Sequence, residues 1–227
     1  MSFFIAAACL APLVRLAVPR AADAPPSNAL HDLRAGLELV GSRTWLWLSI
    51  AFFGAANLLD AGPRHVALPF LIHDRLGLNV SALGAVSSAI AVGSVAAAVF
   101  IGRFRRLRHR GWMRYGAEIV MGSMLIVWGL STSLPPVLAA AFIFGIAIST
   151  GGLMWTNSVQ EMVPADSLGR VTSIDALGSF VLLPLGFAVA GVLSDRLGPS
   201  NVFLLGGSLV VVISLLILLV PSIRYLD

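Results

Sequence analysis

The chain has 227 residues, of which 58% are hydrophobic and only 11% are charged. Soluble domains carry about 25% charged residues, so this composition excludes an ordinary soluble protein. All fifteen basic residues are arginines, and they flank apolar segments rather than cover a polar face, which argues against a nucleic-acid partner. The single cysteine, Cys9, excludes a disulfide framework and a thiolate metal site.

Seven hydrophobic segments follow one another along the chain. Three uncharged stretches, 80–101, 134–160 and 197–223, each reach the length of about 20 residues that a helix needs to cross a bilayer. The sequence therefore predicts an all-α, multi-pass membrane protein. The seven segments cover residues 2–17, 45–72, 80–101, 116–133, 135–157, 171–194 and 200–221.

The first segment, 2–17, begins almost at Met1 and has no basic residue before it. A signal peptide has its positive charges ahead of the apolar stretch, whereas Arg15 and Arg20 come at its end. We therefore expect residues 1–17 to be the end of a transmembrane helix whose upstream part precedes this chain.

Residues 18–43 form a predicted linker in two parts, and residues 44–227 a predicted six-helix bundle. Residues 18–27 are rich in proline and alanine and are unlike a regular element. Asn28 is a suitable cap for a short helix that ends at Ser42. Its apolar positions are Leu30, Leu33, Leu37 and Val40, with charged residues on the other face. This spacing predicts an amphipathic helix on the membrane surface.

The arginines predict the orientation, because positive charge favours the cytoplasmic side. Twelve arginines lie at the end of the first segment, in the linker, in the 102–115 and 158–170 loops and at the C-terminal end, and only Arg75 and Arg196 lie in the opposite connections. The sequence thus predicts an inner-membrane protein with its linker and C-terminus in the cytoplasm.

Four polar residues interrupt the second segment: Asn57, Asp60, Arg64 and His65. Asp60 and Arg64 are four residues apart, so on a helix they share a face and can pair. Gly62-Pro63 predicts a kink whose freed backbone groups face protein or a cavity. Ionisable residues inside a span mark functional sites, which favours a substrate or proton pathway. A structural ion pair and, if the helix ends at Leu59, a periplasmic loop are the alternatives.

Further polar residues also have candidate roles. Trp155 and Asn157 end an uncharged helix, where they line a central cavity or bond to a neighbouring helix. His65 is a candidate proton carrier, because histidine titrates near neutral pH. Arg114 and Glu118 are four residues apart and predict a plain ion pair.

Small residues recur at every fourth position in two segments, which allows close helix packing. They are Ala85, Ala89, Gly93 and Ala97 in the third segment and Gly186, Ala190 and Ser194 in the sixth.

The stretch 160–198 reads QEMVPADSLGRVTSIDALGSFVLLPLGFAVAGVLSDRLG, and residues 32–40 read DLRAGLELV. Together they resemble the C-terminal half of a major facilitator superfamily transporter, in the drug and siderophore exporter branch with enterobactin-exporter-like and macrolide-efflux-like proteins. The positions that carry the resemblance are Val163-Pro164, Gly169-Arg170-Val171, Pro184-Leu185-Gly186, Gly191, Asp195 and Gly198. One departure is GRFRRLRHRG at 102–111, which lacks the acid of the family's repeated Gly-x-x-x-Asp-Arg-x-Gly motif.

The resemblance implies helices seven to twelve of that fold, preceded by the remnant of helix six. It implies a proton-coupled exporter of a small amphipathic molecule, with Gly169, Arg170 and Asp175 at a cytoplasmic gate. Arg170 as an orientation anchor beside Asp175 is the simpler alternative. No catalytic constellation, cofactor motif or Walker A sequence is present, which argues against an enzyme or an ATP-driven pump.

The expected partners are a small-molecule substrate, protons, the bilayer, and either an N-terminal half or a second copy of the chain. Two alternatives remain open: a half-size transporter that works as a homodimer, and a non-transporting scaffold or inert product of a truncated gene.

Overall fold

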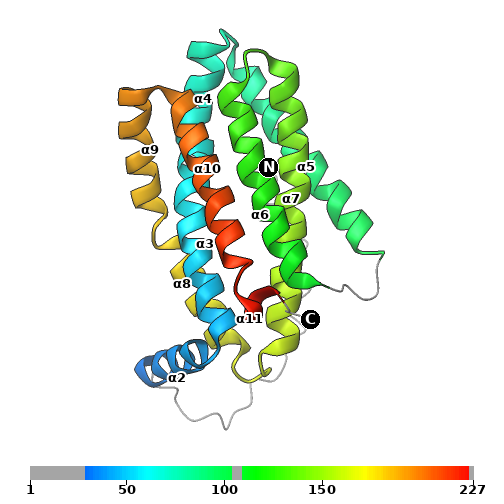
Figure 1. Cartoon of the computed structure of the whole chain (residues 1–227), viewed down its shortest axis with the longest axis vertical. Coiled ribbons are helices and arrows are strands. Elements are labelled where there is room, and N and C mark those ends of the chain that lie inside the picture. The colour runs from blue at the N-terminus through cyan, green and yellow to red at the C-terminus, as the bar shows by residue number, and fades with distance from the viewer. Residues whose placement is uncertain (1–28, 104–108, 225–227) are drawn as a thin grey trace, which may run out of the picture.

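The computed structural model describes residues 29–103 and 109–224, and this part of the chain is helical without strands (Figure 1). The main helices are α2 (Ala29–Ser42), α3 (Thr44–Gly62), α5 (Val80–Ile101), α6 (Arg110–Leu130), α7 (Leu134–Met162), α8 (Leu168–Phe180), α9 (Leu183–Leu197), α10 (Pro199–Ile217) and α11 (Pro221–Arg224). The predicted segment 2–17 and the irregular part of the linker lie outside the described residues.

In the part of the chain that the structure describes, the long crossings of the bundle are α3 with its extension, α5, α6, α7, α8 with α9, and α10. Within the described ranges, five of these crossings are long and apolar enough to span a bilayer, which confirms a multi-pass membrane protein. The exception is α6, which contains Arg110, Arg114 and Glu118. Figure 1 shows α2, the α7–α8 connection and α11 at one end, and the α9–α10 connection at the other.

The second hydrophobic segment, expected over 45–72, does not end at Leu59. Its helix continues from Thr44 to Arg75 through a π-helical turn at Pro63–Ala67, the short α4 (Leu68–Phe70) and a second π-helical turn at Leu71–Arg75. A wider turn accommodates a proline, which has no N–H to donate within the helix. The loop alternative for the charged residues of this segment is therefore wrong.

The sixth hydrophobic segment, expected as one helix over 171–194, is broken between α8 and α9 at Val181 and Leu182. Pro184 has no N–H to donate to the carbonyl of Phe180, so the helix cannot continue unchanged across this point. The chain resumes a helical course when the Gly186 N–H donates to the Leu182 carbonyl at 2.9 Å. The consequence is a discontinuous helix half-way through the bundle.

The linker helix α2 begins one residue after the expected cap and lies across the end of the bundle (Figure 1). Its Leu33 and Leu37 are exposed, while Val40 is buried. Gly36 is close to α8, because a Cβ at this position would lie 2.6 Å from Ile174 Cδ1. The helix is therefore packed against α8 and leaves an apolar stripe uncovered.

Two helix pairs approach closely at small residues. A Cβ on Gly93 of α5 would collide with the Phe142 carbonyl of α7, and Ala97 one turn later is 4% exposed. Between α3 and α9, a Cβ on Gly186 would lie 2.9 Å from the Leu58 carbonyl oxygen. Gly191 is in a more open place, because its nearest neighbour, Val66 Cγ1, is 4.0 Å away.

The close approach at Gly93 gives a stability prediction. We expect Gly93→Leu to lower the free energy of unfolding by about 2–3 kcal/mol, because the new side chain has to displace the α7 backbone. Gly84→Leu on the same helix is the matched control, since nothing lies within 4 Å of a Cβ there. Unfolding in detergent, followed by circular dichroism, compares the two variants. Equal losses would contradict the close α5–α7 contact.

Candidate functional site

A cavity of about 330 Å³ lies among α3, α6, α7 and α8, inside the crossings rather than at their ends. Its polar wall consists of Asn57, Asp60, Arg64, Arg114, Glu118, Asp175 and Ser179. Its apolar wall includes Phe53, Met121, Ile148, Trp155 and Phe180. The volume is within the range of about 300–1,000 Å³ that is typical of small-molecule pockets.

Asp60 and Arg64 form the ion pair that their spacing predicts. Arg64 Nη2 donates to Asp60 Oδ2 at 3.3 Å, and the aspartate side chain is only 8% exposed. The guanidinium also faces the Phe144 ring, with 5.6 Å between Cζ and the ring centroid. Asp60 Oδ1 and Arg64 Nε are buried without a hydrogen-bond partner. The pair thus retains one unused acceptor and one unused donor beside the cavity.

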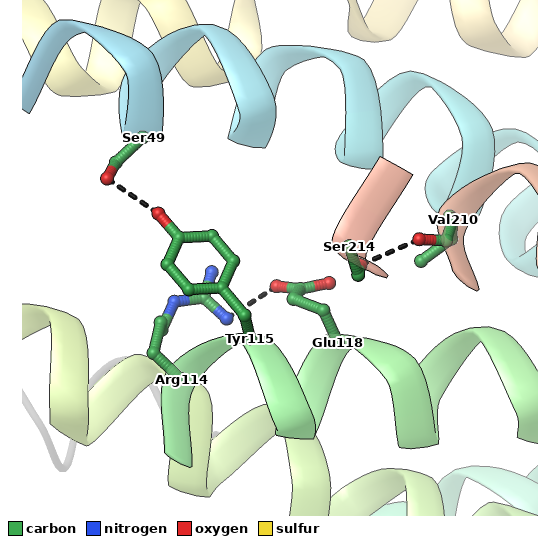
Figure 2. Close-up of polar contacts among 6 residues, drawn as sticks. All are labelled: Ser49, Arg114, Tyr115, Glu118, Val210 and Ser214. Atoms are coloured by element: carbon green, nitrogen blue, oxygen red, sulfur yellow. Dashed lines mark hydrogen bonds and ion pairs between the residues drawn. The ribbon is translucent and has the colours of Figure 1, made fainter. Parts of the chain in front are cut away.

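A second ion pair, Arg114–Glu118 on α6, lines the same cavity (Figure 2). Arg114 Nη1 donates to Glu118 Oε1 at 2.5 Å, and the glutamate side chain is 8% exposed. Arg114 Cζ lies 4.1 Å from the centroid of the Phe53 ring, so the cation also has an aromatic partner. The pair was expected from its spacing, but its place in the cavity was not.

Arg114 and Glu118 face α3 because a hydrogen bond connects α6 to α3 next to this pair. The hydroxyls of Tyr115 and Ser49 lie 2.6 Å apart, and Figure 2 shows this bond from α6 to α3. The Phe52 ring meets Tyr115 edge-on with centroids 5.1 Å apart. On the α10 side, Ser214 donates to the Val210 carbonyl at 2.6 Å and not to Glu118. These contacts orient α6 so that its charged residues point into the bundle.

Asp175 of α8 has two neutral partners. Trp155 Nε1 donates to Asp175 Oδ2 at 2.8 Å, and the Ser179 hydroxyl donates to Oδ1 at 3.1 Å. The next turn ends at the α8–α9 break, where Asn57 Nδ2 donates to the Ser179 carbonyl at 3.0 Å. Asn57 therefore satisfies a backbone group at the broken helix and lines the cavity at the same time.

The sequence model of the Major Facilitator Superfamily matches residues 53–225 of this chain. The chain belongs to this superfamily. Macrolide efflux protein A of Streptococcus pyogenes is 23% identical over 220 residues, which cover 92% of this chain and 53% of that protein. The family match and the relatives named as transporters confirm the resemblance to this superfamily that the sequence shows.

Two other relatives of this chain are named for substrates other than a macrolide. The 4-hydroxybenzoate transporter PcaK of Pseudomonas aeruginosa is 29% identical over 200 residues, 78% of this chain and 44% of that protein. The major myo-inositol transporter IolT of Bacillus subtilis is 24% identical over 169 residues, 74% of this chain and 36% of that protein. The chain spans about half the length, or less, of the curated relatives it matches. No solved structure matches.

The structure brings together only part of the predicted site of this major facilitator chain. Asn57, Asp60, Arg64 and Trp155 line the cavity, while His65 and Asn157 do not. His65 is exposed and meets the Phe187 ring edge-on, with centroids 5.8 Å apart. Successive side chains on a helix point in different directions, so Arg64 lines the cavity while His65, the next residue, does not.

The three residues predicted at a gate lie in two places. Gly169 and Arg170 line a separate cavity of about 570 Å³ between α2 and α8. There Arg170 Nη2 lies 2.8 Å from Asp32 Oδ1 of the linker helix. Asp175 lies instead in the central cavity, beside Trp155. Among the described residues, no group of three or more histidine, cysteine or acidic side chains is placed to bind a metal.

Proposed function

We propose that this chain is the C-terminal half of a secondary exporter, which moves a small amphipathic molecule such as a drug or siderophore outward. Two buried ion pairs around one cavity carry the proposal. Charged groups inside a membrane span are expensive, and they face cavities that carry substrates or ions. The mixed aromatic and charged wall suits an amphipathic molecule.

The helix order supports alternating access between two inverted repeats. The first repeat comprises α3 with its extension, α5 and α6, and the second comprises α7, α8 with α9, and α10. The discontinuous α8–α9 helix borders the cavity, which is typical of transporter binding sites. In this proposal the inner-membrane protein has α2 and α11 on its cytoplasmic side.

Proton coupling is the part of the proposal that supplies energy. Asp60 is the candidate carrier because it is buried, faces the cavity and has one unpartnered carboxylate oxygen. A proton on Asp60 would release Arg64 from its partner. That exchange would link proton entry to a change in the charges that the substrate meets.

Efflux in cells tests the proposal. The gene is expressed in its natural reading frame in a drug-sensitive strain, and the accumulation of a macrolide and of the neutral dye Nile red is measured. We expect lower accumulation than with an empty vector, and loss of the effect with an uncoupler or with Asp60→Asn. Asp166→Asn is the control, because Asp166 is exposed in the loop before α8. Unchanged accumulation of every compound would favour a non-transporting scaffold.

The coding sequence upstream of Met1 decides how the second half of the cavity is supplied. An open frame that encodes further membrane spans would favour a single long exporter. A stop codon close upstream would favour two copies of this chain. Cross-linking in membranes would then have to give a dimer.

A further inference from the structure

The charges around the cavity do not balance. Two arginines and three carboxylates line it. Arg64 pairs with Asp60, and Arg114 pairs with Glu118. Asp175 is the remaining carboxylate, and it has no salt bridge within the described part of the chain. The cavity therefore has one negative charge without a cation.

Asp175 is oriented by donors that carry no charge. The Trp155 indole N–H and the Ser179 hydroxyl each occupy one carboxylate oxygen. These bonds fix the carboxylate against α7 and within its own helix, but they add no positive charge. Each carboxylate oxygen can accept more than one hydrogen bond, so capacity for a further donor remains.

Aromatic rings in the same cavity also favour a cation. Cations are attracted to the faces of tryptophan and phenylalanine rings. Phe53 already faces Arg114, with Cζ 4.1 Å from its centroid. Trp155 and Phe180 also line the cavity, and no arginine of the described ranges faces either ring. Trp155 already meets the Phe53 ring edge-on with centroids 4.8 Å apart, whereas Phe180 is 57% exposed and therefore accessible to a cation from outside.

We propose that Asp175, Trp155 and Phe180 form a cation subsite, so that the molecule carried is an organic cation with an apolar body. The inference rests on the proposed transport function and narrows its substrate class. Membership of the family does not determine the charge of the substrate, because the relatives are named for a macrolide, for 4-hydroxybenzoate and for myo-inositol. An uncompensated carboxylate in a membrane span is unfavourable until a cation joins it.

Two probes with nearly the same shape and opposite charge test the subsite. Tetraphenylphosphonium and tetraphenylborate are compared by equilibrium binding to the purified full-length protein in a neutral detergent. We expect the cation to bind more tightly. Asp175→Asn is expected to weaken cation binding by about tenfold or more, because a close charge pair is lost. The same change is expected to leave the affinity for tetraphenylborate unchanged or higher.

Two further variants separate charge from shape. Asp166→Asn removes an exposed carboxylate outside the cavity and is expected to leave both affinities unchanged. Trp155→Phe retains an aromatic face but removes the N–H that orients Asp175, and is expected to weaken cation binding less than Asp175→Asn. Equal binding of both probes to the wild-type protein, or an unchanged cation affinity in Asp175→Asn, would overturn the subsite.

The outcome is distinguishable from a failure of the proposed function. Export restricted to neutral or anionic compounds would keep the transporter and reject the cation subsite. Cation binding that depends on Asp175, without export of any compound, would keep the subsite and reject the transporter.

Discussion

Arg64→Leu is expected to lower the free energy of unfolding by about 3–5 kcal/mol, because it leaves the buried Asp60 without its cation. Asp60 has an 8% exposed side chain, and one of its oxygens already lacks a hydrogen-bond partner. The double variant Asp60→Leu/Arg64→Leu is expected to recover most of the loss, since two apolar residues carry no desolvation cost. Denaturant unfolding in detergent measures both variants.

The exposed pair Arg34–Glu38 on α2 is a matched control for this result. It has the same spacing of four residues and a 3.0 Å contact between Arg34 Nε and Glu38 Oε1, but its side chains are 83% and 68% exposed. Arg34→Leu is therefore expected to cost less than about 1 kcal/mol. A double variant of Asp60 and Arg64 as unstable as Arg64→Leu alone would show that the pair stabilises the fold directly.

Efflux by the double variant separates the two interpretations of the Asp60–Arg64 pair. If the variant folds but no longer lowers substrate accumulation, the pair serves transport. If folding and efflux both return, the pair is needed for neither, and the proton pathway has to lie elsewhere. This comparison decides between interpretations that spacing alone left open.

Local spacing was sufficient to predict both cavity ion pairs. Four residues make slightly more than one helical turn, so Asp60 reaches Arg64, and Arg114 reaches Glu118, whatever the rest of the fold does. The direction in which each pair faces depends on other helices. For α6 it depends on the Tyr115–Ser49 bond across to α3, which joins residues distant in sequence.

Some differences between the structure and the sequence-based predictions could have been foreseen from the sequence. Arg170 and Asp175 are five residues apart, which places them on different sides of a helix and argues against one shared gate. Pro184 marks the α8–α9 break, because a proline inside a helical pattern removes one backbone bond. The partner of the Ser179 carbonyl at that break, Asn57, is on α3, and no local pattern connects the two.

Glu118→Leu is the second substitution with a large expected effect, again about 3–5 kcal/mol in the free energy of unfolding. It leaves Arg114 buried, with Phe53 as its remaining partner at 4.1 Å. Glu38→Leu is the control, because Glu38 pairs with Arg34 at the same spacing of four residues while both side chains are exposed, at 68% and 83%. That change is expected to cost less than about 1 kcal/mol.

The double variant Arg114→Leu/Glu118→Leu is expected to fold nearly as well as the wild-type protein, by the same reasoning as for α3. A pair that can be replaced without loss of stability is not needed for folding. Its retention inside a membrane span therefore points to the cavity that it shares with Asp60 and Arg64. We expect the double variant to lose efflux while it keeps its helical content. Efflux at the wild-type level would instead exclude Arg114 and Glu118 from the transport pathway, and α3 and α8 would then supply its charges alone.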